Sequence, residues 1–150
     1  MKYILLDLNG VVIKTTSHDF DNWLLKRGLN PKKVNKVYME VAWKLHKGQI
    51  SQKEAMKIIN NKLNTKFSSK EFFKARFNYK FTLNKSLMAK IKKWQSQGIK
   101  VALLSDISRP SWNFVKKSNF MKQFDDLIIS CNTGFRKEES KYYDYLAKRL

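Results

Sequence analysis

Three short apolar runs, each followed by small polar or acidic residues, constrain the fold of this 150-residue chain more than any other feature. The runs span Tyr3 to Leu6, Ile99 to Leu104 and Leu127 to Ile129, and Lys100 is the charged residue within them. Continuous apolar runs of this length are typical of parallel strands that are buried on both faces. The sequence therefore predicts an α/β protein with a parallel sheet, whose strands end at one shared edge.

The gap after the first run is the second constraint. About 90 residues separate Asp7 from Lys100, which is far longer than the usual crossover between neighbouring strands. The gap between the second and third runs is short, and Pro110 there indicates the start of a single helix. We therefore expect a Rossmann-like core formed by residues 1–14 and 84–150, with a separate module inserted at residues 15–83.

The inserted segment has helical periodicity, with apolar residues at the i, i+3, i+4, i+7 spacing of an amphipathic helix. Two helix starts are marked by capping boxes, Ser51 with Glu54 and Ser68 with Glu71. Phenylalanines recur every four residues at Phe73, Phe77 and Phe81, a spacing that predicts an aromatic stripe along one helix. We expect residues 15–83 to form an all-helical cap.

The composition limits the function classes. Lys and Arg total 31 against 12 Asp and Glu, giving a net charge of +19. The lysines are dispersed, which favours a solvated surface that attracts anions such as phosphorylated substrates. A basic nucleic-acid-binding protein remains an alternative. The lone Cys131 excludes an intrachain disulfide, and the sequence has no membrane-length apolar segment and no uninterrupted signal peptide. We predict a cytoplasmic protein without a membrane partner.

Chemically useful residues follow each predicted strand. Asp7 ends the first, Ser105 and Asp106 end the second, and Lys137 lies beyond the third. The carboxyl ends of parallel strands meet at one edge, so a carboxylate, a hydroxyl and a cation can converge there on one phosphate. A carboxylate can attack phosphorus when a metal ion and a cation offset its repulsion from the substrate.

Four segments then carry a family resemblance. Residues 4–12 read Ile-Leu-Leu-Asp-Leu-Asn-Gly-Val-Val, residues 101–106 read Val-Ala-Leu-Leu-Ser-Asp, and residues 134–137 read Gly-Phe-Arg-Lys. In this order they resemble the first three motifs of the haloacid dehalogenase (HAD) superfamily. Residues 47–54, Lys-Gly-Gln-Ile-Ser-Gln-Lys-Glu, are similar to a motif in the helical caps of the subgroup that includes small sugar-phosphate phosphatases.

The resemblance implies a role for each matching residue. Asp7 would attack phosphorus to form an aspartyl-phosphate, and Asp7 together with the carbonyl of Asn9 would bind Mg²⁺. Ser105, the N–H of Asp106 and Gly10 would bind the substrate. Lys137 would neutralise the charge that develops during transfer. Asp7, Asn9 and Lys137 are therefore the expected catalytic residues, and a small phosphorylated metabolite is the expected substrate.

The sequence departs from the family pattern at two places. Asn9 replaces the second aspartate, which acts as general acid, and an amide cannot perform that function. A fourth motif, on a strand that would lie beside the first, does not follow the segment before Leu150. We therefore expect a fragment with an exposed edge on the first strand, through which a second copy could pair. The hypotheses are a weak or inactive HAD-like phosphatase, and a non-catalytic protein that binds phosphate or another protein.

Overall fold

The computed structural model describes residues 2–150, which form both strands and helices. In chain order they are β1 (Tyr3–Asp7), β2 (Ile13–His18), α1 (Phe20–Leu25), α2 (Pro31–His46), α3 (Gln52–Leu63), α4 (Ser69–Arg76), β3 (Tyr79–Leu83), α5 (Lys85–Ser96), β4 (Lys100–Ser105), α6 (Arg109–Val115), the 3-10 helix η1 (Asn119–Gln123), β5 (Asp126–Ile129), α7 (Ser130–Thr133) and α8 (Ser140–Arg149).

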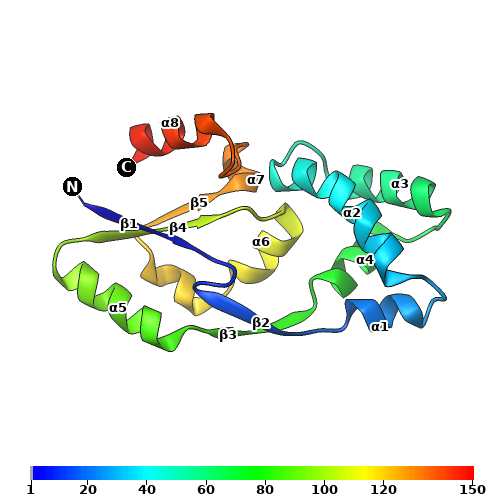
Figure 1. Cartoon of the computed structure of the whole chain (residues 1–150), viewed down its shortest axis with the longest axis horizontal. Coiled ribbons are helices and arrows are strands. Elements are labelled where there is room, and N and C mark those ends of the chain that lie inside the picture. Colours follow the sequence, from blue (N-terminus) through cyan, green and yellow to red (C-terminus); the bar gives the residue numbers. More distant parts are fainter. Residues whose placement is uncertain (1) are drawn as a thin grey trace.

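The three predicted strands form one parallel sheet in the order β1-β4-β5. Successive side chains of β4 point to opposite faces. Val101 and Leu103 pack in the cluster that contains residues of α5 and α6, whereas Ala102 packs with Tyr142 of α8. Helices therefore cover both faces of the sheet (Figure 1), and the predicted α/β fold with an inserted helical region is confirmed. We call this part, without α1–α4, β2 and β3, the sheet region.

Helices α1–α4 form a second body, here called the helical region, with its own apolar cluster built on residues such as Phe20, Leu45, Ile59 and Phe72. Helices α3 and α4 begin at the predicted residues, but only α3 has the complete capping box: at α4 Ser68 accepts from the N–H of Glu71, whose carboxylate pairs with Arg27. The side chain of Ser51 accepts from the N–H of Glu54, whose carboxylate accepts in return from the N–H of Ser51. These reciprocal bonds satisfy backbone donors that the first turn of a helix otherwise leaves free.

The inserted region is helical as predicted from α1 to α4, but its two ends are strands that the sequence analysis did not foresee. β2 and β3 pair in antiparallel fashion, from Ile13 opposite Leu83 to His18 opposite Tyr79. This two-stranded ribbon carries the chain into the helical region and back to the sheet region (Figure 1). The predicted domain limits at residues 14 and 84 remain predictions.

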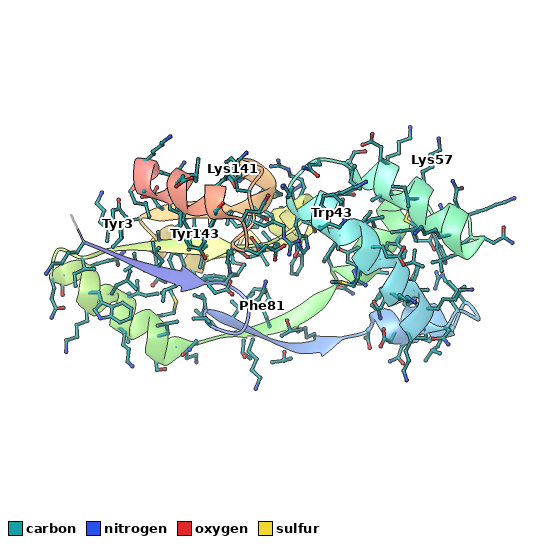
Figure 2. All side chains as sticks on the ribbon, turned by 45° about the horizontal axis from the view of Figure 1, so that its top comes forward. Tyr3, Trp43, Lys57, Phe81, Lys141 and Tyr143 are labelled. Atoms are coloured by element: carbon teal, nitrogen blue, oxygen red, sulfur yellow. The ribbon has the colours of Figure 1, made fainter. Side chains whose placement is uncertain are left out.

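The predicted aromatic stripe is wrong in its last member. Phe73 and Phe77 stack at the end of α4, but Phe81 lies on β3 and packs edge-on against Phe120 at a centroid distance of 6.1 Å. Figure 2 shows Phe81 beneath the sheet region, away from the helical region. Four-residue spacing also suits alternate positions of a strand, so the spacing alone could not distinguish the two structures.

Strand β1 pairs only with β4 within the described residues, so its other edge is free in this chain. Leu5, in the middle of β1, is 43% exposed. This arrangement agrees with the expected exposed edge, and pairing with a second copy there remains a prediction. In residues 2–150 no helix combines the length and the apolar character that crossing a membrane requires.

Candidate active site

The carboxyl edge of the sheet brings a carboxylate and a cation from distant parts of the sequence into direct contact. Asp7 ends β1, and its Oδ1 lies 2.7 Å from Nζ of Lys137, which lies in the loop between α7 and α8. The Asp7 side chain is 43% exposed and that of Lys137 is 29% exposed. The pair is therefore open to a ligand, and a phosphate placed beside Asp7 would also lie beside a positive charge.

Asp106 holds the loop that carries Lys137. Its two carboxylate oxygens both accept from the backbone N–H of Lys137, at 3.3 Å each, and one lies 3.8 Å from Nε of Arg136. Burial raises the pKa of the Asp106 carboxyl above its usual value, while the bond from Lys137 and the charges of Lys137 and Arg136 act in the opposite direction. The Asp106 side chain thus positions the cation that pairs with Asp7.

The hydroxyls of Ser105 and Tyr142 are among the buried polar groups that have no hydrogen-bond partner within residues 2–150. Ser105 is 1% exposed and ends β4, one residue beyond Leu104, the register partner of Asp7. Tyr142 of α8 is also 1% exposed and its hydroxyl is unpaired. Burial, followed by the charge of Asp106, raises the pKa of Tyr142, so this hydroxyl stays protonated as a donor. Buried polar atoms without partners are uncommon and suit a site that receives an oxygen-rich ligand.

Asn9 and Gly10 lie in a tight turn between β1 and β2. Gly10 has a φ of +79°, which favours glycine, and its N–H donates to the carbonyl of Ile13 at 2.8 Å. Leu8 is completely buried, and its carbonyl accepts from Ile13 at 2.9 Å. The turn therefore fixes the backbone directly after Asp7, whereas the Asn9 side chain is exposed. Asn9 offers an amide where a general acid would need an ionisable proton.

The helical region contacts the same loop through Lys47, which follows α2. Nζ of Lys47 donates to Oε1 of Glu139 at 2.6 Å, and Oε2 of Glu139 accepts from the N–H of Arg136 at 2.8 Å. These bonds lower the pKa of Glu139, the one from Lys47 most strongly. Glu139 thus connects the helical region to the residue that precedes Lys137.

Gly48 allows the helical region to lie close to α7 of the sheet region, because it has no side chain. It has a φ of +67°, and a Cβ added there would lie 2.7 Å from the carbonyl oxygen of Cys131 in α7. Any other residue would push the two regions apart, because that contact is with rigid backbone. Figure 2 shows Trp43, one turn earlier in α2, near this junction of the two regions.

His46 lies between the two regions as well. Its Nδ1 is buried without a hydrogen-bond partner among the described residues. Burial lowers its pKa to about 4, and the nearby charges of Arg136 and Arg76 add to the effect. His46 is therefore a neutral side chain at neutral pH, beside the loop of the site.

The oxygen atoms of the site can supply part of a metal shell. Among the described residues no group of three or more His, Cys, Asp and Glu side chains could hold a metal ion. Mg²⁺, however, usually keeps several waters and takes only one or two carboxylates plus substrate oxygens. A carboxylate oxygen of Asp7 and the carbonyl of Asn9 are oxygen donors of the kind that Mg²⁺ takes, and a metal site formed by them remains a prediction.

The structure thus places the sequence-predicted residues along one edge: Asp7 and Lys137 are in contact, Asp106 bonds to Lys137, and Ser105 ends the strand beside Asp7. Asn9 and Gly10 lie in the turn that follows Asp7. Sequence reasoning missed the side-chain role of Asp106 and missed Glu139 and Tyr142, because no local pattern marks them.

Comparison with solved structures decides the fold. A HAD family enzyme of Bacteroides thetaiotaomicron, BT-2542, solved with magnesium and inorganic phosphate, superposes with a TM-score of 0.78 at 18% identity, covering 99% of this chain and 78% of that chain. The chain has the fold of HAD family enzymes. No protein-family model matches the sequence, and no curated protein does.

Two further structures with the HAD fold match over the same length. A predicted HAD-like family hydrolase from Porphyromonas gingivalis has a TM-score of 0.69 at 15% identity, covering 99% of this chain and 76% of that one. A candidate β-phosphoglucomutase from Thermotoga maritima has a TM-score of 0.52 at 16% identity, with coverages of 99% and 70%. The resemblance found in the sequence is therefore confirmed at the level of the HAD fold.

Proposed function

We propose that this protein is a HAD-like phosphoryl-transfer hydrolase in which Asp7 is the nucleophile. The observation that carries the proposal is the 2.7 Å contact between Asp7 and Lys137 at the edge where parallel α/β sheets bind ligands. A cation here offsets the repulsion between a carboxylate and an anionic phosphate. The magnesium and phosphate bound by BT-2542 support the same chemistry for this fold.

In the proposed step, a carboxylate oxygen of Asp7 forms a bond to phosphorus while the bond to the ester oxygen breaks. The leaving group departs with the electron pair of that bond. Ser105 and Tyr142 would donate hydrogen bonds to phosphate oxygens, and Lys137 would stabilise the transferring group. Mg²⁺ held by Asp7 and the Asn9 carbonyl would supply further charge neutralisation.

Asn9 restricts the substrates that this step can use. An amide donates no proton to the leaving group, so the departing oxygen must be stable as an anion. Aryl and acyl phosphates meet that condition, whereas alkyl phosphates, such as those of sugars, do not. We therefore expect turnover of phosphorylated small molecules with good leaving groups, followed by slow hydrolysis of the aspartyl-phosphate, because Asn9 cannot activate water either.

The decisive experiment combines turnover and trapping. The protein with Mg²⁺ should hydrolyse 4-nitrophenyl phosphate and should form an acid-stable phosphoryl adduct with acetyl phosphate, detected by intact-protein mass. The Asp7→Asn variant should lose both. If the wild-type protein shows neither hydrolysis nor adduct, the enzymatic proposal is wrong. Saturable phosphate-ester binding without turnover would then indicate a protein that only binds phosphate.

A further inference from the structure

A groove of about 650 Å³ lies within the helical region, along α3 and beside the start of α4. The residues that line it extend from Lys53 to Asn61 on α3 and from Phe67 to Ser69 where α4 begins. Figure 2 shows Lys57, one of these residues, at the end of the molecule opposite the sheet region. The groove is therefore separate from the candidate active site around Asp7.

The apolar part of the groove is formed by two side chains that the helical region holds in place. Met56 is 2% exposed and belongs to the apolar cluster of the helical region, and Phe67 packs against the same cluster. The side chain of Asn60 donates to the carbonyl of Phe67 at 2.8 Å and accepts from its N–H at 3.0 Å. These bonds fix the loop that carries Phe67, so a ligand would meet a groove that is already formed, which lowers the cost of binding.

The polar part of the groove is cationic. Lys53 and Lys57 are exposed, lie one helical turn apart on α3, and have no hydrogen bond or ion pair with the side chains that the structure describes. Lys53 lies in the first turn of α3, where the helix dipole disfavours a positive charge, so helix stability does not account for it. Glu54 also lines the groove, but its carboxylate accepts from the N–H and the hydroxyl of Ser51. A ligand in the groove therefore meets a positive charge.

The dimensions of the groove suit a short helix. Asn61 follows Lys53 by eight residues, so the groove follows α3 for roughly 12 Å, which is about two helical turns. Carboxylates at positions i and i+4 of a second helix have the same spacing as Lys53 and Lys57. An apolar residue on the same face of that helix would contact Met56 and Phe67, as in other complexes in which an amphipathic helix lies in a groove.

Other occupants fit these features less well. A second copy of this chain carries the same net charge of +19 and is repelled. The phosphates of a nucleic acid would match the lysines but would leave the apolar surface beside Met56 and Phe67 uncovered. An extended peptide has no strand edge to pair with here, because helices α3 and α4 form the groove.

We propose that this groove binds an acidic amphipathic helix of a partner protein. Glutamate or aspartate side chains of that helix pair with Lys53 and Lys57, and an apolar side chain packs beside Met56 and Phe67. The inference does not depend on the proposed chemistry at Asp7, since the two sites lie in different regions of the molecule.

Fluorescence anisotropy with labelled helical peptides tests the chemistry of the partner on the wild-type protein. The probe consists of four Glu-Ala-Ala-Leu repeats, which place Glu and Leu side by side on one face. Its Kd should rise about tenfold when every Glu is replaced by Gln, and about tenfold when every Leu is replaced by Ala. If the three peptides bind with equal affinity, the proposal is overturned.

Variants of the protein locate the binding. Lys53→Gln/Lys57→Gln should raise the Kd of the Glu-Ala-Ala-Leu probe about tenfold. Lys53→Glu/Lys57→Glu should abolish this binding and should bind a peptide of Lys-Ala-Ala-Leu repeats more tightly than the wild type does. The matched control, Lys32→Gln/Lys36→Gln, removes the same charge at the second and sixth positions of α2, outside the groove, and should leave the Kd within about twofold.

Two results would overturn the assignment. If the control and Lys53→Gln/Lys57→Gln weaken the probe equally, overall charge explains the binding and the groove has no part in it. If a DNA duplex binds more tightly than the probe and loses this affinity in the same variant, the partner is a nucleic acid and the proposed partner class is wrong. Thermal unfolding of each variant checks that it is folded.

Discussion

The sheet region and the helical region differ in how they use polar side chains. At the edge of the sheet, Asp7 pairs with Lys137, Asp106 accepts from the backbone N–H of Lys137, and the buried hydroxyl of Ser105 has no hydrogen-bond partner among the described residues. The helical region instead buries an aromatic cluster and contributes one cation, Lys47, to the loop of the site. The sheet region thus holds the residues that the proposed reaction uses, and the helical region contributes Lys47, which bonds to Glu139 in the loop that carries Lys137.

Among the substitutions that test this difference between the two regions, Asn9→Asp should have the largest effect. Asn9→Asp supplies the missing acid/base group next to the nucleophile, so kcat for alkyl phosphates should rise by roughly 10²–10⁴-fold. The rate with 4-nitrophenyl phosphate should change much less in the transfer step, because its leaving group needs no proton. Burst kinetics on both substrates would measure this. An equal gain on both substrates would mean that Asn9 limits only the later hydrolysis.

Removal of the cation should have the next largest effect. Lys137→Met should lower kcat by about 10²–10³-fold, because Asp7 and the transferring phosphoryl group lose their positive neighbour. The matched control is Lys141→Met on α8, an exposed lysine visible in Figure 2. Steady-state kinetics of the two variants give the comparison. If the two variants lose kcat equally, the loss comes from the change in overall charge and not from the position of Lys137 beside Asp7.

His46 provides a test of the junction between the regions. Its lowered pKa of about 4 means that the unfolded chain takes up a proton below pH 6.5 while the folded chain does not. Stability should therefore fall as pH decreases from 6.5 toward 4. In the variant His46→Phe this part of the pH dependence should disappear. Its Tm at pH 4.5 should rise by roughly 2–4 °C for each kcal/mol of unfolding free energy that is regained. If the Tm of the two proteins changes with pH in the same way, the inferred burial of His46 is contradicted.

The smallest effect is expected at Glu139. Its pKa is lowered from the usual value of 4.5, so its bond to Lys47 stabilises the folded state above that pH and is lost as pH falls through the lowered value. Glu139→Gln should accelerate amide hydrogen exchange at residues 47–51 and should change kcat by less than about threefold. Unchanged exchange at these residues would show that the ion pair does not hold the helical region in place.

Much of the fold follows from the sequence because local patterns determine it. Continuous apolar runs specified β1, β4 and β5, and Ser51 with Glu54 specified the start of α3. The ribbon was not predictable, since β2 is a short polar strand whose stability depends on pairing with β3. The apolar spacing that includes Phe81 fits both helix and strand, and only packing against Phe120 decides between them.

The candidate site was predictable in part for a similar reason. Asp7 and Lys137 could be placed together because the ends of parallel strands must meet. The contact between Lys47 and Glu139 joins residues 92 positions apart and depends on how the two regions dock. The roles of Asp106 and Tyr142 depend on the directions in which their side chains point. The residue types do not reveal these directions.

The antiparallel ribbon has a consequence for how such a protein can evolve. Because Ile13 lies opposite Leu83, the chain enters and leaves the helical region at nearly the same point. The segment between is a loop whose ends are already held together, so lengthening or replacing it adds little closure entropy and leaves the register of the sheet unchanged. The helical region can therefore diversify through insertions and exchanges in one part of the gene, while the sheet edge that carries Asp7 and Ser105 is inherited intact.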